Sequence, residues 1–325
     1  NRTIEDGGPL QGDGSYLFVD VGEWAIVNPP QVQLRAQSVA PVRFERENVV
    51  AGEGAASDSM AYLGPFEEHV RSANGQRFRL VVPEAADLSE SPAAILDSLT
   101  NASRSLRIGD RDETVTAFAA PTDRVEWGVR GLATGESEFW VRDNEVLDEP
   151  ANVWLHEYVH TRQAFETTSE TRWLTEATAQ YYAAQLTLEQ GRIGFEAFRG
   201  ELARGERATY DDVVLASPST WTANANYVKG ALAAGRVDLA LRAATTRSGT
   251  LEVVLRELNG RESAVTQTEF LDAVETAGGA ESRATAVEIT ETGEPLSTCE
   301  QQRHSRLVQT VPAHVGYPRP TAGDG

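Results

Sequence analysis

Two histidines and a glutamate stand at a spacing that can hold a metal ion and activate water. In the segment His156-Glu157-Tyr158-Val159-His160 the histidines are four residues apart, so on a helix both imidazoles lie on one face and can bind one ion. Glu157 is rotated by about 100° from His156 on such a helix, which places its carboxylate beside the metal. There it can accept a proton from a metal-bound water, which is the chemistry of zinc hydrolases. The alternative is a pair of unconnected histidines on a helix surface.

A third metal ligand is expected on the helix that follows. This helix begins near Arg172 and is rich in alanine and large apolar residues, so we expect it in the interior. Glu176 is the one charged residue between Arg172 and Glu189. Because a buried carboxylate is costly unless it is paired or bound to a cation, Glu176 is our candidate for the third zinc ligand, with a fourth position open for water. The alternative is a partly exposed glutamate on an alanine-rich helix.

A tyrosine farther along the chain is a candidate for stabilising a reaction intermediate. The segment Asn226-Tyr227-Val228-Lys229-Gly230 opens another long helix, and Lys229 is the only lysine among 29 basic residues. A phenol is a good donor to a developing oxyanion, so Tyr227 is our candidate for that role. The alternative is a tyrosine that only packs at the start of a buried helix.

Taken in order, these three segments resemble the gluzincin metallopeptidases, with the glycyl aminopeptidase and zinc aminopeptidase families as the nearest branch. Those families show H-E-x-x-H, then W-x-x-E-G-x-A-x-Y, then Y-x-K-G at a helix start. The present chain has His156–His160, Trp173–Tyr181 and Tyr227–Gly230, and the resemblance covers about residues 150 to 280. It implies a thermolysin-like catalytic domain, Zn²⁺ as cofactor and a peptide or protein substrate. It also implies zinc ligands at His156, His160 and Glu176, a general base at Glu157 and a transition-state donor at Tyr227.

The chain departs from these families at several positions. Fifteen residues separate His160 from Glu176, fewer than is usual, and Ala177 replaces a common glycine. Gln180 stands where thermolysin-like enzymes often have an aspartate that orients the first ligand histidine. No G-x-M-E-N segment, which holds the free amine of the substrate in aminopeptidases, precedes the zinc motif. The nearest acidic candidates for such a segment are Glu126, in Glu126-Trp127-Gly128, and Glu136 and Glu138, in Gly135-Glu136-Ser137-Glu138. Exopeptidase activity therefore does not follow, and the choice between end and internal cleavage stays open.

The pattern of elements predicts an α+β fold. We expect a β-rich N-terminal domain over residues 1–88, a catalytic domain with a thermolysin-like α/β part and a mainly helical part over 89–280, and a polar tail or linker over 281–325. Expected strands include 15–21, a hairpin turning at Asn74-Gly75, 114–119 and 138–142, the last as the edge strand that pairs with substrate. Helices are expected from Ser91-Pro92 to Leu106 and over most of 172–277, with a capping box at Thr266 to Glu269.

Composition limits the environment and the partners of the protein. The net charge of −20 argues against nucleic acid as a partner. An acidic surface with arginine in place of lysine resembles haloarchaeal proteins, although a GC-rich mesophile is an alternative. The single Cys299 excludes an intramolecular disulfide, and no 18-residue apolar run predicts a membrane span. Because the chain begins at Asn1, we expect a processed protein that is extracellular or at the cell surface. We interpret His69, His304 and His314 as surface or structural histidines.

Two functions from different classes fit these observations. The first is a zinc peptidase in which Glu157 is the general base and Tyr227 stabilises the oxyanion. The second is a cell-surface binding or structural protein that keeps the zinc peptidase fold with weak or no turnover, as the short ligand spacing and the missing amine-binding segment suggest. An intact Glu157 favours the first, because a zinc site without catalysis has no need of a base there.

Overall fold

Two β-sheets and seven α-helices make up the part of the chain that the structure describes, so the fold is α+β as expected. The computed structural model describes residues 18–30, 46–222 and 224–296. The smaller sheet is antiparallel with the order β1-β2-β4-β3, formed by Phe18–Asp20, Ala25–Val27, Ala61–Leu63 and Gly54–Ala56. Cys299, His304 and His314 lie outside the described residues.

The larger sheet carries the strands that reach the site. Its order is β5-β6-β7-β9-β8, formed by Phe66–Ala73, Gln76–Pro83, Thr114–Ala120, Glu138–Arg142 and Gly131–Ala133. Strands β6, β7 and β9 run parallel, while β5 and β8 are antiparallel to their neighbours. The turn between β5 and β6 confirms the predicted hairpin, because Asn74 and Gly75 both have positive φ, 56° and 79°, as a type I′ turn requires.

The expected domain boundary at residue 88 does not coincide with a division between sheets. Strands β5 and β6 lie before this boundary, yet β6 pairs in parallel with β7, which lies after it. The hairpin signal is local and says nothing of the sheet that the hairpin joins, whereas the parallel pairing joins strands that α1, Pro92–Ser105, separates in the chain. The hairpin is therefore part of the larger sheet, next to the strands that lead to the site.

The expectation that strand 138–142 forms the sheet edge is wrong. This strand, β9, lies between β7 and β8, and the short strand β8 forms the edge. Strand β8 has only three residues, which is too short for an alternating pattern, so the sequence does not predict it. Hydrogen bonds join Arg130 to Arg142 and Thr134 to Glu138, which leaves the N–H and C=O groups of Gly131 and Ala133 on the open side of the edge.

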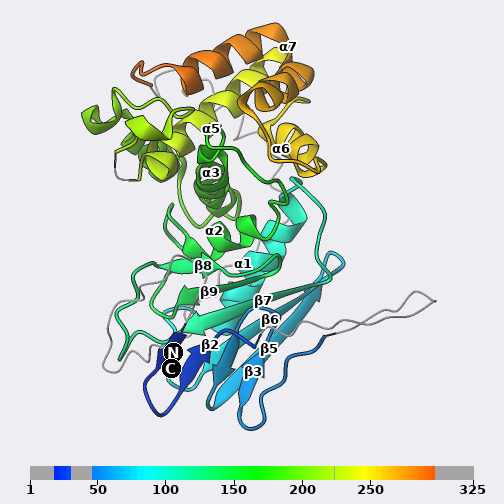
Figure 1. Ribbon diagram of the computed structural model, residues 1–325, viewed down its shortest axis with the longest axis vertical. Coiled ribbons are helices and arrows are strands. Elements are labelled where there is room, and N and C mark those ends of the chain that lie inside the picture. Colours follow the sequence, from blue (N-terminus) through cyan, green and yellow to red (C-terminus); the bar gives the residue numbers. More distant parts are fainter. Residues whose placement is uncertain (1–17, 31–45, 223, 297–325) are drawn as a thin grey trace, which may run out of the picture.

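Three helices follow one another outward from the larger sheet. Figure 1 shows α2, Val153–His160, between the larger sheet and α3, Trp173–Glu189. Helix α2 packs on α1, α3, β8 and β9, and α3 packs in turn on α5, Ala225–Ala244. The remaining helices are α4, Phe195–Leu202, α6, Leu251–Asn259, and α7, Gln267–Glu291.

Helices α3 and α5 approach closely at one pair of small residues. A Cβ atom added to Gly230 would lie 2.7 Å from the Cβ of Ala177, closer than real Cβ contacts allow. Gly230 follows Tyr227 by one helical turn, and Ala177 follows Glu176 directly. This contact therefore determines how near the start of α5 comes to the start of α3.

The last helix corrects the expected tail. The capping box of Thr266 and Glu269 is present, as predicted, but helical structure continues past Gly279 to Glu291. Gly279 has φ 80°, which bends the chain between two helical stretches, so the pair Gly278-Gly279 marks a kink and not the end of the folded unit. Ala286 and Ile289 are buried in the core, so residues 281–291 belong to the folded unit.

Within the described residues, none of the helices combines the length and the apolar character needed to span a lipid bilayer.

Candidate active site

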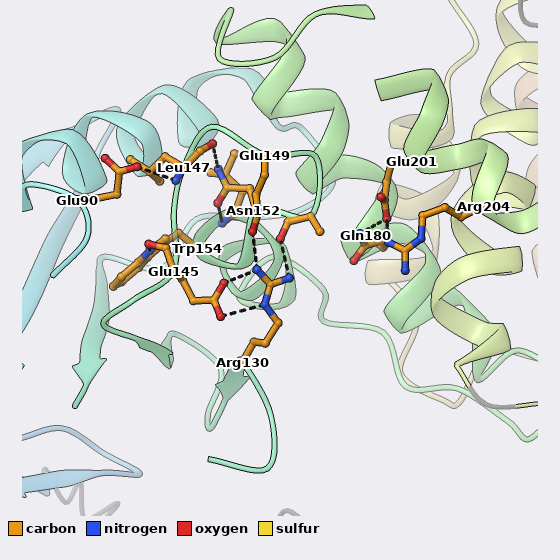
Figure 2. A network of polar contacts seen from close by, with 12 residues as sticks. Glu90, Arg130, Glu145, Leu147, Glu149, Asn152, Trp154, Gln180, Glu201 and Arg204 are labelled. Carbon is orange, nitrogen blue, oxygen red and sulfur yellow. Dashed lines mark hydrogen bonds and ion pairs between the residues drawn. The ribbon is translucent and has the colours of Figure 1, made fainter. Parts of the chain in front are cut away.

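The zinc motif lies on a buried helix, as its spacing requires. Asn152 caps α2, since its side chain accepts a hydrogen bond from the backbone N–H of Leu155 at 3.1 Å. The same side chain donates to the carbonyl of Leu147, which fixes the entry of the chain into the helix (Figure 2). His156 and Glu157 are buried, with 8% and 6% of their surface exposed.

Three potential ligand atoms converge at the geometry that zinc requires. The Nε2 atoms of His156 and His160 are 3.1 Å apart, and Oε2 of Glu176 lies 3.2 Å and 3.4 Å from them. Ligands of a tetrahedral zinc ion at 2.0–2.2 Å are separated by roughly 3.3–3.6 Å. The three predicted residues therefore lie on one face of a tetrahedron with little adjustment. They are the only such group of three metal-binding side chains among the described residues.

Gln163, and not Gln180, contacts a histidine of the motif. Its Oε1 lies 2.8 Å from Nδ1 of His160, while its Nε2 donates to the Thr175 carbonyl and the Thr178 hydroxyl. In the neutral imidazole, an acceptor at Nδ1 places the proton there and leaves Nε2 free to bind a metal ion. Gln180 instead donates to Glu201 at 3.1 Å. Family position points Gln180 at the first histidine, His156, whereas the glutamine that contacts a histidine is Gln163, and its partner is the second histidine, His160.

Tyr227 lies against the same group of side chains. Its ring stacks on the imidazole of His156 with centroids 5.9 Å apart and planes 10° from parallel. Burial raises the pKa of Tyr227, and the neighbouring carboxylates of Glu176 and Glu157 raise it further, so the phenol keeps its proton. The structure thus brings a protonated hydroxyl from α5 to the ligand atoms on α2 and α3.

Glu157 is held between α2 and the sheet edge. Burial raises its pKa above the ordinary value, partly offset by His156, by His160 and by a hydrogen bond from the backbone of Ala133 in β8. A Cβ atom at Gly131 would lie 2.8 Å from Oε1 of Glu157 and 2.7 Å from Cγ1 of Val153. Only glycine lets β8 pass so close to this carboxylate.

The ligand side chains perturb one another strongly. Burial alone would lower the pKa of His160, but Glu176 and Glu157 outweigh it and raise the pKa to about 9. Burial likewise opposes ionisation of Glu176, yet hydrogen bonds to His156 and His160 hold its pKa far below the ordinary value. Without a metal ion, His160 is therefore protonated and positively charged, and the adjacent Glu176 is ionised.

These side chains line a groove of about 660 Å³ between β8 and the helices. Arg130 is fixed on one side by ion pairs to Glu145 and Glu149, and on another side Arg204 pairs with Glu201 (Figure 2). The groove passes the ligand atoms and follows the free edge of β8. It can therefore accommodate an extended chain with one bond near Glu157.

The three acidic candidates for binding a substrate amine do not reach this groove. The carboxylate of Glu138 is occupied by Ser57 Oγ at 2.7 Å and the Ser59 backbone N–H at 2.9 Å. Glu126 and Glu136 are not among the residues that line the groove. Glu138 instead joins the loop after β3 to the larger sheet.

Lys229 has a structural explanation. Its ammonium group is buried and donates to the carbonyls of Tyr210 at 2.9 Å and Val213 at 2.7 Å. A lysine at this helical position ties the loop before α5 to the helix that carries Tyr227. His69, on β5, has Nε2 3.4 Å from Glu67, consistent with a structural histidine.

Four functional features escaped sequence reasoning: the contact of Gln163 with His160, the need for glycine at 131, and the groove positions of Arg130 and Glu201. The i, i+3 spacing of His160 and Gln163 is a weak signal for the first. The others depend on contacts between segments distant in the chain and leave no local pattern.

Solved structures of other proteins have a similar fold. An aminopeptidase N family protein from Idiomarina loihiensis superposes with a TM-score of 0.62 at 17% identity, over 76% of this chain and 50% of that one. An M1 zinc metallopeptidase mutant from Deinococcus radiodurans gives 0.57 at 20% identity, over 74% and 55%. A further structure of that mutant, with a Tyr-Ser-Ala substrate bound, gives 0.54. No protein-family model and no curated protein matches the chain.

About three quarters of this chain shares its fold with part of an M1 zinc metallopeptidase. At these identities the likeness concerns the fold alone, and the chain spans about half the length of the proteins that it matches. Those proteins are zinc metallopeptidases, a class of hydrolases, which agrees with the class that the motifs indicate.

Proposed function

We propose that the protein is a zinc-dependent peptidase of the gluzincin type. His156, His160 and Glu176 hold the zinc ion, which when bound supplies a Lewis acid that lowers the pKa of water to about 7 and polarises a carbonyl. Glu157 accepts the proton of the attacking water and passes it to the leaving amine. Tyr227 donates a hydrogen bond to the oxyanion of the tetrahedral intermediate. The observation that supports this proposal most is the 3.1–3.4 Å spacing of the three ligand atoms.

The burial of Glu157 favours a peptidase over a binding protein with the same fold. A carboxylate with little exposure and a raised pKa is costly for stability, and the groups that favour its charged form are His156, His160 and the Ala133 backbone. A protein that used zinc only for architecture would be more stable with an uncharged residue at this position. Catalysis gives this residue a function that structure alone does not.

The test is the variant Glu157→Gln on a mixed peptide library. The amide keeps the shape and the Ala133 contact but cannot accept a proton, so zinc should stay at one ion per chain while turnover falls by about 10²–10⁴-fold. The matched control is Glu170→Gln, the same change at an exposed position outside the groove. Near-normal turnover in Glu157→Gln, or no turnover in the parent protein, would contradict the proposal.

We further infer that cleavage does not require a free N-terminal amine. The edge strand β8 is Gly-Leu-Ala and offers no carboxylate to the groove. Of the carboxylates that line the groove, Glu157 and Glu176 belong to the zinc site, and Glu201 is already paired with Arg204 at 2.7 Å. An ammonium group of a substrate would therefore lack an uncompensated negative partner among the described residues.

A pair of otherwise identical peptides, one free and one acetylated at its N-terminus, tests this inference. We expect kcat/KM for the two to agree within about threefold, and cleavage products to arise from internal bonds. Cleavage of the free peptide alone, one residue at a time, would show an aminopeptidase and leave the zinc mechanism intact.

A further inference from the structure

A second pocket, remote from the groove, is lined by five arginines. It measures about 320 Å³ and lies where the end of α1, the loop 106–111, the segment after α2 and helix α6 meet. The five are Arg104, Arg107, Arg111, Arg162 and Arg256, and Leu106 and Gly109 complete the lining. In a chain with a net charge of −20, so many cations around one hollow require a physical explanation.

Arg162 forms the floor of this pocket and is 2% exposed. Its Nε donates to the carbonyl of Asp110 at 2.8 Å, Nη2 donates to the carbonyl of Gly109, and Nη1 donates to the hydroxyl of Tyr158 at 3.1 Å. These neutral acceptors satisfy hydrogen bonds but do not neutralise the charge. A buried cation that forms no ion pair with a described carboxylate is poorly compensated, so the site favours an anion from solvent.

The other four guanidinium groups are also held by neutral partners or left open. Arg111 donates twice to the Ser103 carbonyl, and Arg256 donates twice to the carbonyl of Arg107. Arg104 donates to Oδ1 of Asn101 at 3.2 Å. Between described residues, no ion pair includes any of the five arginines, and the Arg107 guanidinium has no hydrogen-bond partner.

Two carboxylates stand near the pocket without neutralising it. Burial raises the pKa of Asp112, and the charge of Arg162 partly offsets this rise. Glu252 accepts a hydrogen bond from the backbone N–H of Arg107 at 3.0 Å. Five cations against these two carboxylates and the exposed Asp110 of the same loop still leave an excess of positive charge. It is concentrated on groups whose forked N–H donors match the oxygens of phosphate and sulfate.

We propose that this pocket binds a multiply charged oxyanion, a phosphate or sulfate group, either free or carried by a small organic molecule. The anion would join three segments that are distant in the chain. Asn259 on α6 already links two of them, donating to the carbonyls of Ile108 and Arg162. A bound anion would strengthen the same junction, so we expect it to stabilise the folded protein.

The experiment measures thermal unfolding and binding heat with inorganic phosphate, pyrophosphate, sulfate and a sugar phosphate, at constant pH and constant ionic strength adjusted with chloride. We expect a saturable rise of the unfolding midpoint and one site per chain by calorimetry. A response to inorganic phosphate identifies the free ion, and a response to the sugar phosphate alone identifies an organic carrier. No saturable response to any of the four ligands would overturn the proposal.

Two matched charge reversals, one in the pocket and one outside it, distinguish binding at this pocket from a general effect of net charge on anion binding. Arg107→Glu should weaken binding by tenfold or more, roughly the loss of one charge-assisted contact plus repulsion. Arg199→Glu changes the net charge equally on α4, where Arg199 pairs with Glu196, and should leave binding unchanged. If Arg107→Glu does not fold, Arg107→Gln tests the same contact and should also weaken binding. Equal loss in the Arg107 and Arg199 variants, or full binding in both, would refute the site.

Discussion

At the scale of single residues, the proposed zinc ligands imply that protons and a metal ion compete for the same three side chains. In the metal-free protein the pKa of His160 is raised to about 9, so this imidazole is protonated at neutral pH and must lose its proton when zinc binds. We expect zinc affinity to rise about tenfold per pH unit from about pH 7 until it levels near pH 9. Competition with a chromophoric chelator across this range measures it. An affinity that does not change with pH would contradict the assignment of His160 as a ligand.

The same shift predicts how the metal-free protein responds to pH. A folded-state pKa above the ordinary 6.5 means that the charged imidazole stabilises the fold. This contribution is complete below about pH 6.5 and is lost as pH rises through about 9. Zinc should remove the dependence, because the metal then holds His160 unprotonated at every pH in this range. Thermal unfolding midpoints across this pH range, measured with zinc and with a chelator, test both expectations.

The hydroxyl of Tyr227 supports another prediction at this scale. Tyr227→Phe deletes the donor and keeps the ring that stacks on His156, so kcat should fall while KM changes little. Loss of one oxyanion donor typically costs about 3–4 kcal/mol in the transition state. Steady-state kinetics on any cleaved peptide measures this effect.

Tyr182 on α3 provides the control for this variant. Its hydroxyl is buried and has no hydrogen-bond partner among the described residues, so Tyr182→Phe should leave both constants unchanged. If kcat of Tyr227→Phe stays within about threefold of the parent, Tyr227 acts by packing alone.

At the scale of elements, the position of Glu157 depends on how closely β8 passes α2. Gly131→Ala would put a Cβ atom 2.8 Å from the carboxylate, so the base must move. Misplacement of a catalytic group by about 1 Å can cost about 10²-fold in rate, and we expect kcat to fall by that order while zinc content is unchanged. Kinetics and metal analysis on the same preparation measure the two quantities.

Gly200 on α4 provides the matched glycine for this test. A Cβ atom there would meet no other atom within 4 Å, so Gly200→Ala should keep full activity. Unchanged turnover in Gly131→Ala would mean that β8 can move away from Glu157 and does not position its carboxylate.

At the scale of the whole molecule, the large negative net charge makes stability depend on salt concentration. The chain has 49 acidic against 29 basic residues, and at about 0.1 M salt the screening length of about 10 Å leaves their repulsion largely intact. At about 1 M the length falls to about 3 Å. We therefore expect the unfolding midpoint to rise between about 0.1 M and about 3 M chloride.

Calorimetry or circular dichroism in sodium and in potassium chloride measures this dependence, and the two salts should agree if screening is the cause. A midpoint that stays flat in both would contradict the resemblance of the composition to haloarchaeal proteins.

Several features follow from the sequence by itself, because their physics is local. The four-residue spacing of His156 and His160 is one turn of a helix, which any helix turns into a shared face. The positive φ angles that Asn74 and Gly75 tolerate determine a hairpin. The capping box at Thr266 satisfies backbone groups within its own turn. None of these needs a distant partner.

Other features were decided only by the tertiary structure, because they depend on distances between segments far apart in the chain. The contact of Gly230 with Ala177 brings Tyr227 and Glu176 to one side of the histidines, and helix periodicity alone does not set that approach. The sheet edge falls on β8, whose three residues carry no periodic signal. Gln163 reaches His160, and five arginines from four segments surround one pocket, because packing places them there.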